Sequence, residues 1–182
     1  TDLSVPFGDV TELTTATRTV TVTNQGGLNL TLGGVGLANS LAPPFALASD
    51  SCSAATLTPA SSCTFDVTFS PATVGNFSDS LDIPSNDADE PSVTLAVSGN
   101  GTAVPVPSIS ITDSVAPSTD QDVPFGSTAI GNTLTRTVTV ANDGNADLVI
   151  GTLTGLALPF SLAADNCSGQ TVAPAGSCTV DI

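Results

Sequence analysis

Four cysteines form two pairs with identical spacing. Cys52 and Cys63 are 11 residues apart, and so are Cys167 and Cys178. A spacing that recurs in each half of the chain favours one disulfide per half, and disulfides persist in oxidising compartments. Four buried free thiols are the alternative, whereas zinc is disfavoured because neither half offers a second pair or a histidine. A closed loop of this length would stabilise each half by about 3 kcal/mol.

The densest acidic segment is Asn86–Glu90. Its carboxylates make Asp87, Asp89 and Glu90 candidate ligands for calcium, which prefers oxygen ligands from loops. Calcium is the one cofactor that the sequence suggests. The segment lacks the glycine and the ligand spacing of an EF-hand, and Asp and Asn also favour tight turns. A solvated turn is therefore the alternative.

Arg18 and Arg136 are the only cationic residues in the chain. In strand alternation Arg18 falls on the inward face with Val20, and Asp79 falls on the inward face of its own segment. Because an unpaired buried charge is costly, we predict a structural ion pair between Arg18 and Asp79, with an arginine at the solvent rim as the alternative.

Four Asn-x-Ser/Thr sequons are possible glycosylation sites. They begin at Asn29, Asn76, Asn100 and Asn166. We expect Asn100 to be the most accessible of the four, because it lies beside a proline-containing linker. Outward threonines on strands are also good β-formers without any modification.

Several residue types that enzymes use do not occur in the chain. It has no His, Lys, Trp, Tyr or Met, which excludes Ser-His-Asp and Cys-His sites. A glycosidase would need a carboxylate pair in a cleft, and the aromatic residues that usually form sugar platforms are scarce. The sequence thus predicts no catalytic residues and no enzyme. The net charge of −15 argues against nucleic acid and against anionic membranes as partners.

Alternation of apolar and polar residues with a period of two dominates the chain and predicts short strands. The segments that show it most clearly are 20–23, 28–32, 63–69, 77–83 and 93–97. Turn residues separate them, and no segment of helical length has a 3.6-residue period. Six or seven such strands in about 100 residues predict an all-β fold of Ig-like antiparallel β-sandwiches.

The chain repeats itself. Val5–Gly8 returns as Val123–Gly126, and Arg18–Val22 returns as Arg136–Val140, both with an offset of 118 residues. The register predicts one sandwich over 1–100, a proline-containing linker over 101–108 and a second sandwich over 109–182.

The register also sets an expectation about the two ends. Ser108–Ile111 reads as the first strand of the second sandwich, and the first sandwich has no equivalent in the sequence. Ile182 aligns with Val67, so the second sandwich is expected to be incomplete at its C-terminal side. Either the sequence belongs to a longer chain, or neighbouring copies supply strands by complementation.

The order and spacing of several motifs resemble a known family. The motifs are Arg18–Gly26, Leu57–Pro71, Ile83–Asp87 and Val97–Gly101, with matches in the second repeat at 136–144 and 174–180. They are similar to the bacterial choice-of-anchor D repeats, Ig-like relatives of the abnormal-spindle/hydin β-sandwich family. The resemblance implies an exported protein, extracellular or at the cell surface, with tandem sandwiches and no shared catalytic residues.

These observations together predict an extracellular structural repeat protein. It would serve as a spacer, a stalk or a subunit of a surface filament, with copies of itself as partners through an array or strand complementation. An adhesin module that recognises a protein or a glycan is the alternative. The structural interpretation is favoured because Trp, Tyr and Arg, which dominate binding hot spots, are scarce.

Overall fold

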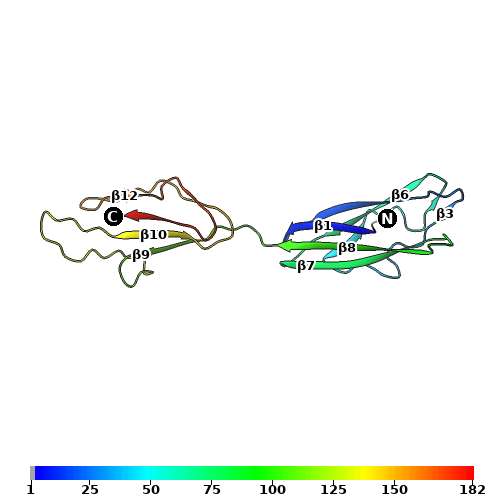
Figure 1. Cartoon of the computed structure of the whole chain (residues 1–182), viewed down its shortest axis with the longest axis horizontal. Helices are drawn as coiled ribbons and strands as arrows, with labels where there is room; N and C mark the ends of the chain where they lie inside the picture. The colour runs from blue at the N-terminus through cyan, green and yellow to red at the C-terminus, as the bar shows by residue number, and fades with distance from the viewer. Residues whose placement is uncertain (1–2) are drawn as a thin grey trace. The chain divides into compact units, whose positions relative to one another are not determined.

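The computed structural model describes residues 3–182, and all regular elements in this range are β-strands (Figure 1). The all-β sandwich fold predicted from the alternation is confirmed. The chain divides into two compact units, Thr1–Val104 and Pro105–Ile182, called unit 1 and unit 2 below. No helix within residues 3–182 is long and apolar enough to cross a membrane.

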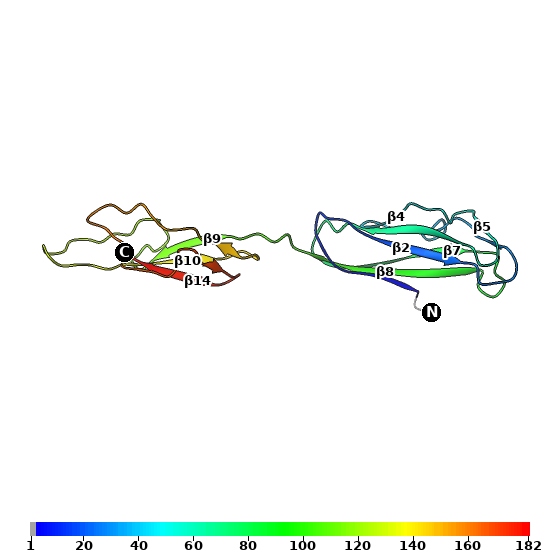
Figure 2. The same ribbon diagram turned by 90° about the horizontal axis from the view of Figure 1, so that it is seen from above.

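The described part of unit 1, residues 3–104, forms two three-stranded sheets and a small two-stranded sheet. The first sheet has the order β1 (Ser4–Thr11), β8 (Ser92–Thr102), β7 (Gly75–Pro84). The second has the order β2 (Ala16–Thr23), β6 (Ser62–Phe69), β4 (Phe45–Ala48). The small sheet pairs β3 (Leu30–Thr31) with β5 (Thr56–Leu57). Figure 2 shows the two layers, with β2 and β4 in one and β7 and β8 in the other.

Strand β1 was not expected from the sequence pattern. It pairs with β8 in parallel, and its register shifts between Pro6 and Asp9. Gly8 supplies a φ of 69° at this irregularity, a conformation that glycine adopts without steric cost. Because Pro6 and Gly8 interrupt the alternation, the pattern alone does not indicate a strand here.

A group of phenylalanines fills the space between the sheets of unit 1. Phe45 and Phe69 stack with ring centroids 4.7 Å apart, and Phe7 lies 5.5 Å from Phe69. Gly99 of β8 makes room for them, because a Cβ there would lie 2.5 Å from the ring of Phe69. Such close packing across two sheets explains why one apolar face per strand is enough to hold the unit together.

The described part of unit 2 forms a four-stranded sheet and a two-stranded sheet. The larger has the order β12 (Ala164–Asp165), β14 (Ser177–Asp181), β10 (Thr137–Asn142), β9 (Ile109–Asp113). The smaller pairs β11 (Leu148–Val149) with β13 (Thr171–Val172). By repeat position β10 corresponds to β2, and β14 corresponds to β6. The two units therefore share this sheet, except that β9 has no counterpart beside β2 within residues 3–182.

The predicted linker over 101–108 is only partly a linker. Gly101 and Thr102 belong to β8, and Gly101 is buried so tightly that a Cβ would lie 2.4 Å from the carbonyl oxygen of Thr73. The boundary between the units falls between Val104 and Pro105. Residues 106–108 bond to unit 2, as described below.

Candidate functional site

Both predicted disulfides are formed. Cys52 bonds to Cys63 with Cα atoms 5.2 Å apart, and Cys167 bonds to Cys178 at 5.3 Å. Cys63 and Cys178 belong to the equivalent strands β6 and β14. Each bond therefore fastens the loop before it to the central sheet of its unit. This pairing is typical of proteins in an oxidising, exported environment.

An aspartate two residues before the first cysteine holds each disulfide loop. Asp50 Oδ1 accepts the backbone N–H of Cys52 at 2.7 Å, and Asp165 Oδ1 accepts that of Cys167 at 2.9 Å. Burial raises the pKa of Asp50, but hydrogen bonds from Ser53 and Cys52 outweigh it and lower the pKa below the usual value. The hydroxyl and the backbone N–H of Ser168, with that of Cys167, lower the pKa of Asp165.

A buried asparagine organises the turn that follows β2 and the turn that follows β10. The Asn24 Nδ2 group donates to the carbonyls of Leu28 at 2.7 Å and Leu57 at 2.9 Å, and its Oδ1 accepts the N–H of Gly26 at 2.9 Å. In unit 2, the Asn142 Nδ2 group donates to the carbonyls of Ala146 and Val172, and Asn142 Oδ1 accepts the N–H of Gly144. We call residues 24–27 the Asn24 turn and residues 142–145 the Asn142 turn.

Residues 106–108 lie across the Asn142 turn. Ser108 N–H donates to Asn142 Oδ1 at 3.2 Å, and Val106 N–H donates to Asn145 Oδ1 at 2.6 Å. Asp143 N–H donates to the Ser108 carbonyl at 2.7 Å. The approach is so close that a Cβ on Gly144 would lie 2.3 Å from the carbonyl oxygen of Val106. This segment is thus part of unit 2.

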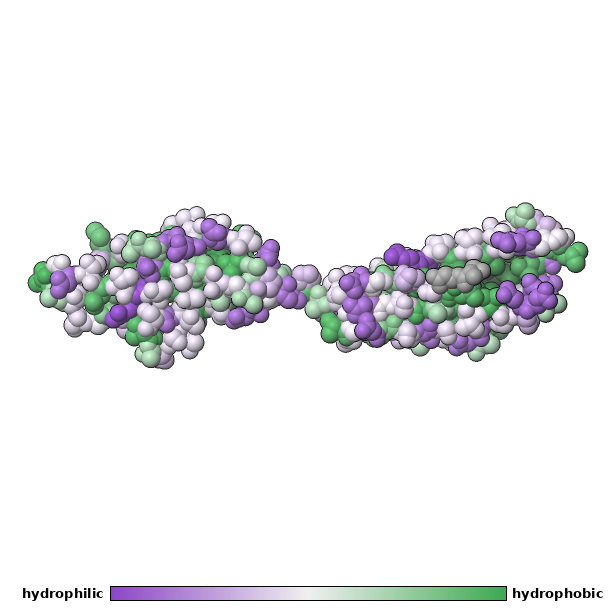
Figure 3. All heavy atoms as spheres, viewed as in Figure 1, coloured by the Kyte–Doolittle hydropathy of each residue, from purple (hydrophilic) through white to green (hydrophobic). Residues whose placement is uncertain are grey.

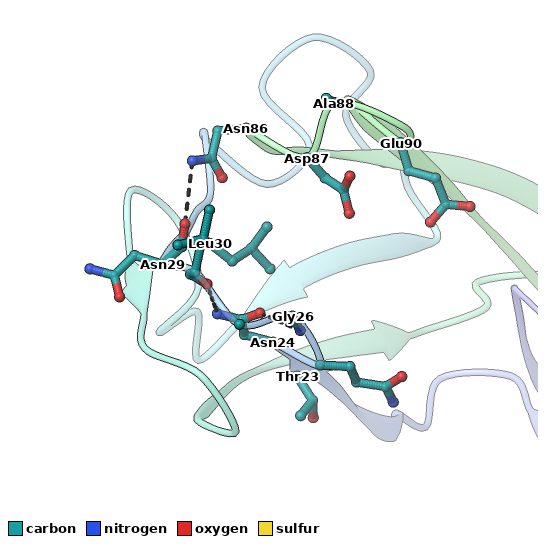
Figure 4. A pocket seen from close by; sticks show the side chains of 12 residues that line it. Thr23, Asn24, Gly26, Asn29, Leu30, Asn86, Asp87, Ala88 and Glu90 are labelled. Atoms are coloured by element: carbon teal, nitrogen blue, oxygen red, sulfur yellow. Dashed lines mark hydrogen bonds between the residues drawn. The ribbon is translucent and has the colours of Figure 1, made fainter.

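The Asn24 turn of unit 1 faces an open cleft instead. The cleft has a volume of about 570 Å³ and lies between the turn and the acidic segment Asn86–Glu90 (Figure 4). Asn86 closes one side, because its Oδ1 accepts the N–H of Thr31 at 2.8 Å. Asp87 and Glu90 project toward the cleft from the same segment (Figure 4). A ligand in this cleft would meet backbone, amide and carboxylate groups.

The acidic segment does not assemble into a metal site. Asp87 Oδ1 accepts the N–H of Asp89 at 3.1 Å, an Asx turn that stabilises the loop locally. Within residues 3–182, no three acidic, cysteine or histidine side chains are grouped to hold a metal ion. The structure therefore does not bring Asp87, Asp89 and Glu90 together as calcium ligands.

The predicted ion pair between Arg18 and Asp79 is wrong. Arg18 is exposed, and its guanidinium carbon lies 5.8 Å from the ring centroid of Phe7, within reach of a cation–π interaction. Asp79 instead accepts the N–H groups of Ala42 and Ser80, each at 2.8 Å. Strand alternation identified the inward face correctly. Alternation could not show that Arg18 lies where this face opens to solvent, because it gives the face of a residue and not its distance from the rim of the sandwich. It also could not show how far apart β2 and β7 lie, because the two strands belong to different sheets.

Three of the four sequon asparagines are exposed. They are Asn29, Asn76 and Asn166. Asn100 is only partly exposed, and its Nδ2 group donates to Asp9 Oδ1 at 2.8 Å. The expectation that Asn100 is the most accessible is therefore wrong. Its strand, β8, is central in a sheet and limits access from both sides.

Sequence reasoning missed the asparagine turns, although a signal existed. Asn24 and Asn142 occupy the same repeat position at the end of an alternating strand, and a glycine follows each two residues later. An Asn at such a place can mimic a backbone turn by bonding the N–H two residues on. The aspartates before Cys52 and Cys167 carry a similar signal, since both precede a first cysteine by two residues.

A family of Ig-like domains matches unit 1. The HYDIN/CFA65/VesB-like Ig-like domain matches residues 2–100. A search of curated protein sequences finds no match. Among solved structures, the VesB protease of Vibrio cholerae is 22% identical with a TM-score of 0.48 over 54% of this chain, which spans 30% of VesB.

Two further solved structures align with parts of this chain or with nearly all of it. The PapD-like domain 7 of human CEP192 is 17% identical with a TM-score of 0.42, covering 57% of this chain and 84% of that domain. A Porphyromonas gingivalis W83 protein of unknown function is 12% identical with a TM-score of 0.44, covering 99% of this chain and 79% of that protein.

Proposed function

This chain belongs to the family of HYDIN/CFA65/VesB-like Ig-like domains, and on that basis we propose that it is a non-catalytic structural repeat protein. Within the family, its motifs favour the choice-of-anchor D type. It works outside the cell or on its surface, as a spacer, a stalk or a subunit of a filament. Its partners are other copies of the same kind of unit.

The observation that carries this proposal is the way the chain passes from unit 1 to unit 2. Val104 N–H donates to Glu12 Oε1 of unit 1 at 3.4 Å, and Val106 N–H donates to Asn145 Oδ1 of unit 2 at 2.6 Å. Only Pro105 lies between these two residues, and the proline ring fixes its φ near −65°. A junction with a single intervening residue supports the spacer proposal, because the proline leaves few free backbone dihedral angles there.

The stabilising contacts inside each unit also support a structural role. The disulfide, the aspartate that holds its loop and the buried asparagine occur at equivalent positions in both units. The disulfides support an exported location, where they persist. Repetition of the stabilising groups indicates that each unit carries its own stability, as expected for a modular array.

The spacer proposal is tested by the distribution of distances between the units. Non-thiol spin labels at the exposed side chains Leu37 and Ile130 report this distance by pulsed electron resonance. We expect a narrow distribution that broadens when four Gly-Ser residues are inserted after Pro105, because a Gly-Ser linker is a flexible coil. An equally broad distribution in the unmodified chain would contradict a spacer.

The location is tested separately in the organism that makes the protein. We expect an antibody to unit 1 to label intact cells or the medium, and external protease to remove the signal. A signal that appears only after cells are opened would contradict an extracellular role.

A further inference from the structure

The outward face of the sheet β1–β8–β7 carries a shallow pocket of about 410 Å³, called the Asp9 pocket below. Each of the three strands lines it with two exposed or half-exposed side chains, which are Pro6 and Asp9, Ser98 and Asn100, and Asn76 and Ser78. Figure 3 shows hydrophilic side chains over the part of unit 1 where β1 and β8 end. All of these residues belong to unit 1.

A bulge in β1 forms one side of the pocket. Pro6 pairs with Ser98 and Asp9 pairs with Asn100, so β1 advances three residues while β8 advances two. In a regular strand the side chains alternate between the two faces, and Asp9 would lie on the inward face with Phe7. The extra residue reverses this, because Asp9 is exposed and Val10 takes the buried position. Bulges often direct a side chain toward a site in this way.

The pocket spans two rows of residues across the three strands. One row is Asp9, Asn100 and Asn76, and the next is Pro6, Ser98 and Ser78. Because neighbouring strands lie about 4.8 Å apart and residues two apart along a strand lie about 7 Å apart, the rows cover about 10 by 7 Å. A Cβ on Gly8 would meet nothing within 4 Å, so the space beside the rows is open. This area suits a small molecule with one ring.

Several polar groups of the pocket are free to bind a ligand. Asp9 Oδ1 accepts Asn100 Nδ2 at 2.8 Å, which fixes both side chains and leaves Asp9 Oδ2 and Asn100 Oδ1 as acceptors. Among residues 3–182, the side chains of Asn76, Ser78 and Ser98 have no hydrogen-bond partner.

Elsewhere on the same face, polar side chains pair with one another. Thr94 Oγ1 donates to Asp82 Oδ1 at 2.7 Å across β8 and β7. Ser80 Oγ accepts Asn39 Nδ2 at 3.0 Å from the loop beside β7. Unpaired donors and acceptors therefore gather at the Asp9 pocket, whereas the neighbouring part of the sheet satisfies its own. A few convergent polar groups in a hollow are typical of a site that orients a polar ligand.

The chemical groups of the pocket match those of a neutral sugar. Sugar hydroxyls both donate and accept hydrogen bonds. The pocket offers both kinds of partner, since carboxylate and carboxamide oxygens accept while amide N–H and serine O–H groups donate. The ring of Pro6 is exposed and offers an apolar surface for the C–H face of a sugar ring.

Charge disfavours other small ligands. The chain has a net charge of −15, and Asp9 is the acidic residue of the pocket, so phosphate and acidic sugars would be repelled. Calcium takes about six to eight oxygen ligands, and a single carboxylate compensates little of its charge. A neutral ligand with several hydroxyl groups fits best.

We propose that the Asp9 pocket binds one neutral sugar unit of a separate glycan. Asp9 Oδ2 and Asn100 Oδ1 accept from its hydroxyl groups. Asn76, Ser78 and Ser98 complete the polar contacts, and the ring of Pro6 packs against the C–H face of the sugar. The site concerns the surface of unit 1 alone and goes beyond the structural role, because a unit with this site also attaches to glycans beside it.

Nuclear magnetic resonance of the whole isotope-labelled chain tests the site. The probes are the methyl glycosides of glucose, galactose, mannose and N-acetylglucosamine. Each is titrated to about 50 mM, because a single sugar in an open pocket is expected to bind with a Kd of about 1–10 mM. We expect at least one probe to shift the amide signals of Asp9, Ser98 and Asn100 until they saturate. No saturating shift at these amides with any probe overturns the proposal.

Two pairs of variants locate the sugar. Asp9→Asn removes the charge of one acceptor and is expected to weaken binding about tenfold, whereas Asp82→Asn removes the same charge outside the pocket and should leave the Kd unchanged. Ser98→Leu fills the pocket and should abolish binding, whereas Ala96→Leu adds an equal side chain on the same face of β8, outside the pocket. Asp9, Ser98 and Ala96 are exposed, so these variants should stay folded, as their amide spectra will show. Equal effects within either pair overturn the site.

Two further measurements separate a bound glycan from other occupants. Calcium chloride alone should leave the same amide signals in place, and saturating shifts with calcium would assign the pocket to a cation and overturn the proposal. Asn76 begins a sequon, so the intact mass of the protein from its native source is also measured. A glycan on Asn76 would put the chain's own sugar at the pocket and overturn binding of a separate one, whereas the unmodified mass supports it. None of these results depends on the distance between the units, so failure of the sugar site leaves the spacer proposal in place.

Discussion

Strands β2 and β10 have nearly the same sequence and lead into the same buried asparagine, yet their surroundings differ. Beside β10 lie β9 and residues 106–108, which bond to the Asn142 turn. Beside β2 lie a groove and a cleft. The repeated residues thus specify the turn, and the strand that pairs with the outer edge of β10 is Ile109–Asp113, outside the repeated motif. Substitutions at equivalent positions of the two turns should therefore differ in their effects.

The largest expected effect is loss of a disulfide. The Cys167→Ala/Cys178→Ala pair should destabilise unit 2 by about 3 kcal/mol, the value for a closed loop of this length. Among residues 3–182, the buried apolar core has five members in unit 2 and fifteen in unit 1, so this loss should remove exchange protection from β10 and β14. The Cys52→Ala/Cys63→Ala pair should leave β2 and β6 protected. Hydrogen exchange measured for each strand tests this expectation. Loss of protection in β2 and β6 together with retained protection in β10 and β14 would contradict it.

The next effect concerns the buried asparagines. Asn24→Ala should destabilise unit 1 by about 2 kcal/mol, because buried carbonyls lose their donor. Asn142→Ala should cost about 1 kcal/mol more in unit 2, since the N–H of Ser108 also loses its acceptor. Urea unfolding measures both, and faster exchange of the Ser108 amide in the second variant identifies the extra loss. Equal destabilisation would mean that the bond to Ser108 contributes nothing.

A methyl group at the paired glycines should show a smaller difference. Gly144→Ala forces a Cβ to within 2.3 Å of the Val106 carbonyl oxygen, and overpacking of this kind costs about 1–2 kcal/mol. Gly26→Ala meets only Asn24 Oδ1 at 3.3 Å and should change stability by less than about 0.5 kcal/mol. Thermal unfolding distinguishes the two. A larger loss from Gly26→Ala would show that the space over the Asn24 turn is not open.

The sequence could not predict most of the differences between the two units, although it predicted the strands and the disulfides. Alternation predicted the segments that became β2, β6 and β8, because each buries one face. It missed β1, where Pro6 and Gly8 interrupt the pattern. The same motif at Val123–Gly126 lies outside any strand. Strand formation at β1 therefore depends on pairing with β8, which local sequence cannot reveal.

The candidate sites show the same contrast between features set by local sequence and features set by the arrangement of the strands. The cysteine spacing predicted both disulfides, because the same separation of 11 residues recurs in each half of the chain. The Arg18–Asp79 pair failed, because alternation gives the face of each residue but not its distance from the rim of the sandwich. The pairing of β10 with β9 depends on which strands lie side by side, and alternation within one strand does not give this.

The smallest expected effect is the response to acid of the two aspartates before the disulfides. The pKa values of Asp50 and Asp165 are lowered in the folded state. The stability they contribute is therefore present above the usual aspartate pKa of 3.8 and is lost as pH falls through the folded values. At Asp50 burial opposes the hydrogen bonds and is the larger single cause, whereas hydrogen bonds from Ser168 lead at Asp165. Asp165→Asn, which keeps an acceptor oxygen without the charge, should flatten the pH dependence of unit 2 more than Asp50→Asn flattens that of unit 1. Urea unfolding at a series of pH values from about 5 to about 2 measures this, and a steeper dependence after either substitution would reverse the sign of the argument.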